Sequence, residues 1–199
     1  FNINTALLNR LNPITNHEGI TVPHNKVTMR EVKELYKNHE VAVHTLTHPR
    51  LPDIEADETV LYEVDEDRKN IEFLTGYEVV GMAYPGGGVN NDDRVAEIIK
   101  NNTGIKYSRT ITFTHNFATQ ENLYRFNPTV YHLDFDVMMD LGHKFIELKP
   151  TTPQIFCIMG HSYEMDAGYI EWERFEALLA KLDGRSDIFY GTNREVFGV

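Results

Sequence analysis

The sequence predicts an α/β fold of one domain, in which strands and helices alternate around a parallel sheet. Short runs rich in β-branched and aromatic residues recur along the 199 residues. Between them lie segments with apolar residues three or four positions apart, which is typical of helices. Histidine and glycine clusters follow three of the runs, where the loops of α/β sheets usually carry function. An α/β barrel and an open doubly wound sheet both fit this pattern.

Six runs are predicted to be strands. Each is short and apolar, and each contains residues that favour an extended backbone. In chain order they are residues 1–4, 41–43, 79–84, 105–107, 154–159 and 188–190.

Five segments are predicted to be helices. The first opens at Thr28, where Glu31 would complete a capping box. Gly104 is expected to end the third helix in the left-handed conformation, and the last helix is expected over residues 170–182. The apolar faces that predict the helices are Val32, Leu35 and Tyr36; Val60, Val64, Ile71 and Leu74; Val95, Ile98 and Ile99; Val137, Leu141, Phe145 and Leu148; and Phe175, Leu178, Leu179 and Leu182.

Composition and charge exclude several classes of protein. With 41% hydrophobic residues and no apolar run of roughly 18 residues, the sequence predicts no membrane span. Its 30 acidic and 19 basic residues give a net charge of -11, which opposes the phosphate neutralisation that nucleic-acid binding requires, so no nucleic-acid partner is expected. The single cysteine, Cys157, lies in the apolar run QIFCIMG and is expected to be buried. The oligomeric state is not predicted.

Two histidines follow the strand predicted at residues 41–43, in the stretch HTLTH. A pair spaced as His44 and His48 are is weak evidence alone, because nine histidines in 199 residues give about 0.4 such pairs by chance. A strand that delivers both imidazoles into one loop could place them beside a divalent cation. From this position alone, metal ligation is about as well supported as the alternative, in which the two histidines lie at the surface or are satisfied by other contacts.

Two further clusters follow predicted strands. In AYPGGG, Pro85 is followed by three glycines, whose unobstructed N–H groups could receive a ligand oxygen, although a plain connecting loop is as well supported. In GHSYE, His161 leaves the most apolar strand. It could act as a general acid, and a histidine satisfied by a neighbouring hydrogen bond is the usual alternative.

These clusters occur together and in order, and the chain resembles the polysaccharide deacetylase family, which includes chitin, peptidoglycan and xylan deacetylases. HTLTH is similar to the metal motif of that family, AYPGGG to its proline-centred loop and GHSYE to its late histidine motif. FNINTALL and GIKYSRT also resemble family segments, so the resemblance covers essentially the whole chain, residues 1–199. It implies a distorted (β/α) barrel.

The resemblance also implies site residues. His44 and His48 would be ligands of a divalent metal, commonly zinc, with cobalt, nickel or manganese as alternatives. The backbone N–H of Gly86 would donate to an oxyanion, and His161 would be the general acid.

Three substrate-binding residues complete the predicted site. They are Tyr84, Pro85 and Arg125, although for Arg125 a surface salt bridge is the better supported interpretation.

Several features of the family are absent from this sequence. The family's first motif, Thr-Phe-Asp-Asp-Gly, supplies a catalytic base and a third metal ligand from the first strand. The chain contains neither aspartate, so we expect an N-terminally truncated domain without the first strand and helix of the barrel, and with little hydrolase activity alone. Ala83 stands where the family often has arginine. The partner of His161 is left open among Asp134, Asp136 and Asp166.

The function expected from the resemblance is metal-dependent removal of acetyl groups from N- or O-acetylated polysaccharide. A carbohydrate-binding pseudoenzyme and an amidohydrolase of a small non-sugar amide are the alternatives. A glycan substrate favours the envelope or exterior of a bacterium, with the cytoplasm left open.

Overall fold

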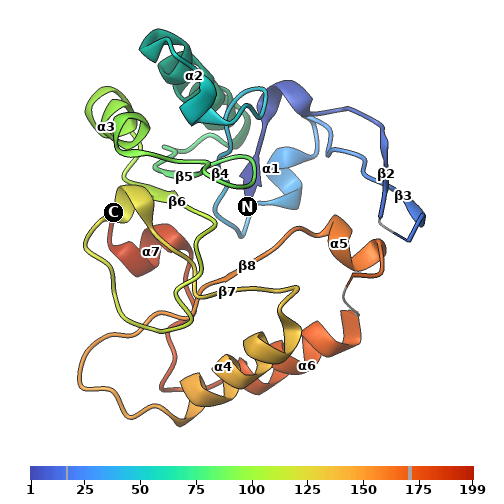
Figure 1. Cartoon of the computed structure of the whole chain (residues 1–199), viewed down its shortest axis with the longest axis vertical. Coiled ribbons are helices and arrows are strands. Elements are labelled where there is room, and N and C mark those ends of the chain that lie inside the picture. Colours follow the sequence, from blue (N-terminus) through green and yellow to red (C-terminus); the bar gives the residue numbers. More distant parts are fainter. Residues whose placement is uncertain (17, 170–171) are drawn as a thin grey trace.

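A parallel sheet forms the centre of the computed structural model, which describes residues 1–16, 18–169 and 172–199 (Figure 1). Val43 lies opposite Met82, and Gly81 lies opposite Tyr107, in parallel pairs. The predicted α/β class is confirmed. The strands stand in the order β1 (Asn2–Ile3), β4 (Ala42–Val43), β5 (Gly81–Ala83) and β6 (Tyr107–Arg109).

Two long helices cover this sheet. On α2 (Asp57–Thr75) the predicted apolar stripe is confirmed, because Val60, Val64 and Ile71 are fully buried. They pack in one core cluster with strand residues and with α3 (Asp93–Asn102). Burial of such side chains stabilises the fold by about 1.5–3 kcal/mol each, so this core holds the strand ends, and the loops that leave them, in place.

A second group of elements lies below the sheet in Figure 1. Strands β7 (Val130–Tyr131) and β8 (Ile158–Met159) are parallel to each other. They pack with α4 (Phe135–Glu147) and α6 (Trp172–Leu182) around a separate core cluster. Within the described ranges the parallel strands thus form a sheet of four and a pair, and the closed barrel stays a prediction.

A small antiparallel hairpin stands beside the sheet. It consists of β2 (Pro13–Thr15) and β3 (Thr21–Pro23), and the sequence analysis did not predict it. The Asn16 side chain donates to the carbonyl oxygen of Ala167 at 2.8 Å. This bond ties the hairpin to the segment that follows α5 (Tyr163–Asp166).

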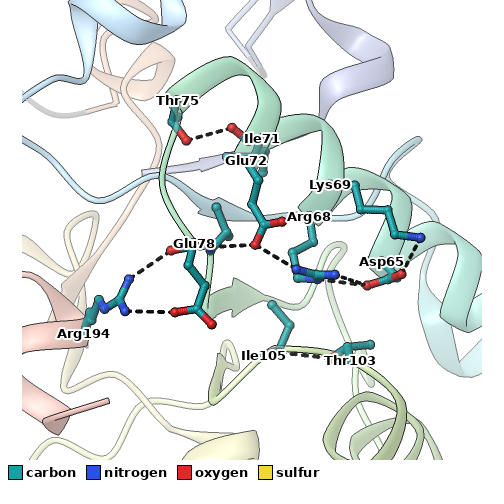
Figure 2. Close-up of polar contacts among 11 residues, drawn as sticks. Asp65, Arg68, Lys69, Ile71, Glu72, Thr75, Glu78, Thr103, Ile105 and Arg194 are labelled. Atoms are coloured by element: carbon teal, nitrogen blue, oxygen red, sulfur yellow. Dashed lines mark hydrogen bonds and ion pairs between the residues drawn. The ribbon is translucent and has the colours of Figure 1, made fainter.

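Ion pairs fasten the outer surface of α2 and the segment after it (Figure 2). Arg68 lies between Asp65 and Glu72, with N to O distances of 2.8 and 2.7 Å. Arg194 donates to the carbonyl and the carboxylate of Glu78, at 2.9 and 3.3 Å. The C-terminal helix is therefore anchored to the turn that leads into β5. The remaining elements are α1 (Val32–Leu35), α7 (Asn193–Phe197) and the 3-10 helices Thr5–Leu7, Leu51–Asp53 and Leu123–Arg125.

Some predicted elements differ from the structure. Residues 188–190 form no strand, because this segment is held by its own side chain: the backbone N–H of Arg185 donates to the hydroxyl of Tyr190 at 3.0 Å. Gly104 does not adopt the left-handed conformation, since the cap residue of α3 is Thr103, in extended backbone. Of the predicted strand 154–159, only Ile158–Met159 is a strand.

The starts of two helices also need correction. The Glu31 carboxylate accepts from the Thr28 backbone and hydroxyl at 2.8 and 2.7 Å, as predicted, but the helix itself begins only at Val32. The predicted start of the last helix, residue 170, lies outside the described residues.

Candidate functional site

His44 and His48 are brought together at the end of β4. Their ring centroids are 4.9 Å apart, with the planes inclined by 74°. The Nδ1 atom of His44 lies 2.8 Å from the carbonyl oxygen of Ala83 on the neighbouring strand. A carbonyl oxygen only accepts, so Nδ1 carries the proton and Nε2 keeps its lone pair. This is the tautomer that a metal ligand needs.

The loop that carries the histidines has an unusual backbone. Thr45 and His48 have φ values of 65° and 68°, in the left-handed region that residues with a Cβ rarely adopt. The Thr45 hydroxyl, fully buried, accepts from the His48 N–H at 3.1 Å. Thr45 thus shapes the loop.

Two acidic residues of α2 hold this loop from behind. The Glu63 carboxylate accepts from the backbone N–H and the hydroxyl of Thr47, at 2.9 and 2.7 Å. The Asp67 carboxylate accepts from the His44 N–H at 3.1 Å and from both the N–H and hydroxyl of Thr5 at 2.7 Å. Burial raises the pKa of Asp67 to about 7, against the lowering effect of these bonds.

The sequence analysis missed both acids. Glu63 and Asp67 are four residues apart, so they share a face of α2, and both are buried next to its apolar stripe. An acidic residue within the buried face of a helix indicates a carboxylate that accepts hydrogen bonds from neighbouring segments, because buried carboxylates are hydrogen-bonded.

The environment of the histidines favours neutral imidazoles. Burial, together with the neighbouring His48, Arg109 and His161, lowers the pKa of His44 to about 3, against the raising effect of its hydrogen bond to Ala83. Partial burial, together with Lys26 and His161, also lowers the pKa of His48. Neutral imidazole is the form that binds a metal.

The donor set fits a metal only in part. His44 presents the right tautomer and the pKa values of both His44 and His48 are lowered, but across the described ranges no group of three His, Cys, Asp or Glu side chains surrounds one point. Two imidazoles would leave the other positions of a zinc ion to water or to further ligands.

The glycine loop after β5 lies beside the histidine loop. Gly86 has φ 82°, and a Cβ added there would stand 3.6 Å from the Cβ of Arg50, which follows His48 by two residues. The buried Asn90 side chain donates to the carbonyl oxygens of Tyr84 and Gly86, at 3.0 and 3.1 Å. Asn90 therefore fixes the loop on either side of Pro85.

The side chains of Tyr84 and Arg125 do not face a shared open site. Tyr84 is 1% exposed, and its hydroxyl donates to the Tyr124 carbonyl oxygen at 2.7 Å, so a substrate contact from the phenol is not supported. Arg125 pairs with Asp93 at 2.6 Å and donates to Asn91 at 2.7 Å. Arg125 therefore forms a salt bridge, which is the interpretation that the sequence favoured.

His161 follows β8 and belongs to a network centred on the buried Glu164. The Oε2 atom of Glu164 accepts from His132 Nε2 at 2.5 Å and from the backbone N–H of His161 at 2.9 Å. It also lies 3.1 Å from His161 Nδ1, and the Tyr131 hydroxyl donates to Oε1. Burial would raise the pKa of Glu164, but these donors outweigh it and hold the pKa well below its ordinary value.

Glu164, and not an aspartate, is therefore the partner of His161. Asp136 pairs with Arg174, Asp166 accepts from the Trp172 indole, and Asp134 precedes α4. The missed signal was the spacing in GHSYE: a glutamate three residues after a histidine can fold back onto it through one helical turn.

The histidine loop and His161 interact electrostatically. His161 contributes to the lowered pKa values of His44 and His48, so it lies within electrostatic reach of both.

A large cleft of about 1010 Å³ lies elsewhere, between α4, α6 and the C-terminal segment, and none of the predicted site residues lines it.

Within the described residues, no helix is both long and apolar enough to cross a bilayer.

Comparison with known proteins supports the resemblance. Residues 14–107 match the family model for polysaccharide deacetylase, while no curated protein matches the sequence significantly. A solved polysaccharide deacetylase from Bacillus cereus is 26% identical, with a TM-score of 0.44, over 52% of this chain and 32% of that one. A CE4 family pseudoenzyme from Bacillus anthracis is 19% identical, with a TM-score of 0.46, over 77% of this chain and 46% of that one.

The chain thus spans less than half the length of these two solved proteins. The matched segment contains the histidine loop, the acids Glu63 and Asp67 of α2 that hold it, and the glycine loop. Residues 14–107 therefore carry the similarity of this chain to the polysaccharide deacetylase family.

Proposed function

We propose that the chain belongs to a metal-dependent hydrolase that removes acetyl groups from N- or O-acetylated polysaccharide. The contact between His44 Nδ1 and the Ala83 carbonyl oxygen carries the proposal. It leaves Nε2 of His44 free to bind a metal, with the His48 ring 4.9 Å away. Zinc is the first choice of metal, with cobalt, nickel and manganese as alternatives.

Each cluster has a chemical role in this proposal. A divalent metal bound by His44 and His48 would polarise the acetyl carbonyl and acidify water. The N–H of Gly86 would donate to the oxyanion that forms as the carbonyl is attacked. The open backbone of a glycine with φ 82° lets the oxygen approach without meeting a Cβ. Pro85 would help position the substrate beside that N–H.

His161 would protonate the leaving amine or alkoxide. Glu164 accepts from the Nδ1 side of the ring, so the proton to be transferred would stand on Nε2. A buried carboxylate at that place orients the ring and stabilises its protonated form, as in other carboxylate and histidine pairs. Glu164 is thus a positioning residue for His161.

A second function is favoured by one observation. The described residues offer two imidazoles but no carboxylate that completes a group of three ligands. A protein that binds saccharides but has no turnover would show the same arrangement. We therefore retain carbohydrate binding without hydrolysis as the second candidate.

The deciding experiment measures acetate released from acetylated chito-oligosaccharides and acetylated xylan. The chain is loaded with zinc, cobalt, nickel or manganese, or treated with EDTA. We expect slow, metal-dependent release that is lost in His44→Gln and His161→Gln and kept in His143→Gln, which alters an exposed histidine on α4. Saccharide binding with no release under any metal would replace the first candidate with the second.

Substrate class is tested in the same assay. Release of acetate from small non-sugar amides, with none from either glycan, would assign the site to an amidohydrolase instead.

A further inference from the structure

A basic pair lies beside His161, on the segment that leaves the β2–β3 hairpin. The ammonium of Lys26 lies 3.0 Å from Nε2 of His24. Because an ammonium group only donates, this nitrogen of His24 is the acceptor. The His24 ring packs on Tyr163 with centroids 4.5 Å apart, and Tyr163 lies 5.5 Å from the ring of His161.

The hairpin holds this pair in place. The backbone N–H groups of His24 and Lys26 donate to the carbonyl oxygens of Asn12 and Arg10, at 2.8 and 2.9 Å. Asn16 joins the same hairpin to the segment after α5. Both side chains are partly buried, so they are less free than exposed surface side chains.

No carboxylate balances this pair among the residues that the structure describes. Arg50, Arg68 and Arg125 each have an aspartate partner, as expected in a chain with 30 acidic and 19 basic residues. The ammonium of Lys26 has only His24 as a hydrogen-bond partner within the described ranges. An ammonium that is partly withdrawn from water and lacks a counter-ion is stabilised by any anion that reaches it.

The neighbouring groups strengthen this local positive potential. Burial is the main cause of the lowered pKa of His24, and Lys26 and His161 lower it further. A cluster of groups of one sign attracts ligands of the opposite sign, even in a protein whose net charge is negative.

We propose that Lys26 and His24 bind an anionic group, a carboxylate or a phosphate, on a ligand that extends toward His161. Charge-assisted hydrogen bonds from an ammonium suit either group. If the proposed deacetylase function holds, on which this step rests, the ligand is an acetylated glycan that carries carboxylates, such as uronic acid units. The anion site itself does not depend on hydrolysis.

The test follows binding to the full 199-residue chain after metal removal with EDTA, by calorimetry. Glucuronate and glucose form the ligand pair, because they differ in a carboxylate, and inorganic phosphate is the third ligand. The variants are Lys26→Gln, His24→Gln and the charge-preserving Lys26→Arg. Lys181→Gln is the matched control, since Lys181 contacts His143 at 2.7 Å in the same manner, on the surface of α6.

We expect glucuronate to bind and glucose not to bind. Loss of a charge-assisted hydrogen bond in Lys26→Gln should weaken glucuronate binding by about tenfold or more. His24→Gln should weaken it less, while Lys26→Arg and Lys181→Gln should bind as the unmodified chain does. Unchanged unfolding midpoints would show that each variant is folded.

Two results would overturn parts of the proposal. If phosphate binds at least as tightly as glucuronate and depends on Lys26, the site takes a free anion and the uronic acid assignment fails. If glucuronate does not bind, or binds equally well to Lys26→Gln, the anion site itself is wrong. Failure of acetate release in the hydrolysis assay would change neither result, because metal-free binding is the readout.

Discussion

His44 donates from Nδ1 to the carbonyl oxygen of Ala83 at 2.8 Å, which joins the end of β4 to the end of β5. The acceptor is a main-chain atom, so the contact does not depend on which side chain stands at position 83. The orientation of His44 thus survives the alanine found where related sequences often carry arginine.

Removal of His44 or His48 should abolish most metal binding. His44→Gln and His48→Gln each leave a single imidazole. Loss of a residue that only hydrogen-bonds to a metal ligand weakens metal binding by about tenfold or more, and loss of a ligand itself should weaken zinc binding further. Calorimetry with zinc measures the change. His143→Gln serves as control, and an unaltered zinc affinity in His44→Gln would refute the assignment of the ligands.

Glu63 should matter for metal affinity without touching the metal. The N–H and hydroxyl of Thr47 donate to different oxygens of Glu63, at 2.9 and 2.7 Å, so a glutamine in the same position would turn its NH2 group toward one of these donors. We expect Glu63→Gln to weaken zinc binding by about tenfold, while Glu58→Gln, on the exposed side of α2, has no effect. Equal affinities for the two variants would show that the loop keeps its shape without this clamp.

Acid should weaken the fold through Glu164. Its pKa is held below the ordinary value of 4.5, so its contribution to stability is present above that pH and is lost as the pH falls toward the lower, folded-state pKa. Glu164→Gln should lower the free energy of unfolding by about 1–3 kcal/mol near neutrality and flatten the decline in acid. Urea unfolding near neutral pH and below pH ~4 measures both effects.

The control for this prediction is Glu176→Gln, which alters an exposed residue of α6. An acid-induced decline as steep in Glu164→Gln as in the unmodified chain would assign the effect to other carboxylates.

Gly160 should be intolerant of any side chain. A Cβ there would stand 2.3 Å from Nδ1 of His132, so alanine must displace the His132 ring and disturb its contact with Glu164. We expect Gly160→Ala to lower the free energy of unfolding by roughly 1–3 kcal/mol. Gly87→Ala is the matched control, because nothing lies within 4 Å of a Cβ at that position. Thermal or urea unfolding of the two variants decides the matter.

Cys157 should react slowly with thiol reagents. Burial raises its pKa to about 11, so only about one molecule in a thousand carries the thiolate at pH ~8. Labelling with a chromogenic disulfide should be slow in the native chain and fast in denaturant. Cys157 is only half-buried and lines the large cleft, so it is more accessible than the sequence predicted. Rapid labelling of native protein would show that its thiolate is more populated than this pKa allows.

The sequence alone predicted where the two histidine clusters lie in the fold better than which side chains hold them. His44 and His161 follow their strands as expected, because apolar runs with polar ends identify strand exits. The partner of His161 was not found, because α5 returns Glu164 to it through a turn of only four residues, too short for a periodic pattern.

The β2–β3 hairpin was missed for a similar reason. Its strands have three residues each, which shows too little alternation to be separated from a loop. The strand expected at 188–190 illustrates the opposite error, because apolar residues were read as extended although Phe189 is 71% exposed. Propensity cannot tell an apolar residue that lines an open cleft from one in a sheet.

The left-handed backbone at Thr45 and His48 bears on how a metal would be acquired. Such conformations each cost about 1–3 kcal/mol and persist only where the surroundings impose them, and here contacts with Glu63, Asp67 and Ala83 hold the histidine loop. The shape of the loop is therefore set by protein contacts. Unlike a zinc finger, whose fold collapses when a chelator is added, the histidine loop is expected to keep its backbone conformation in the presence of a chelator.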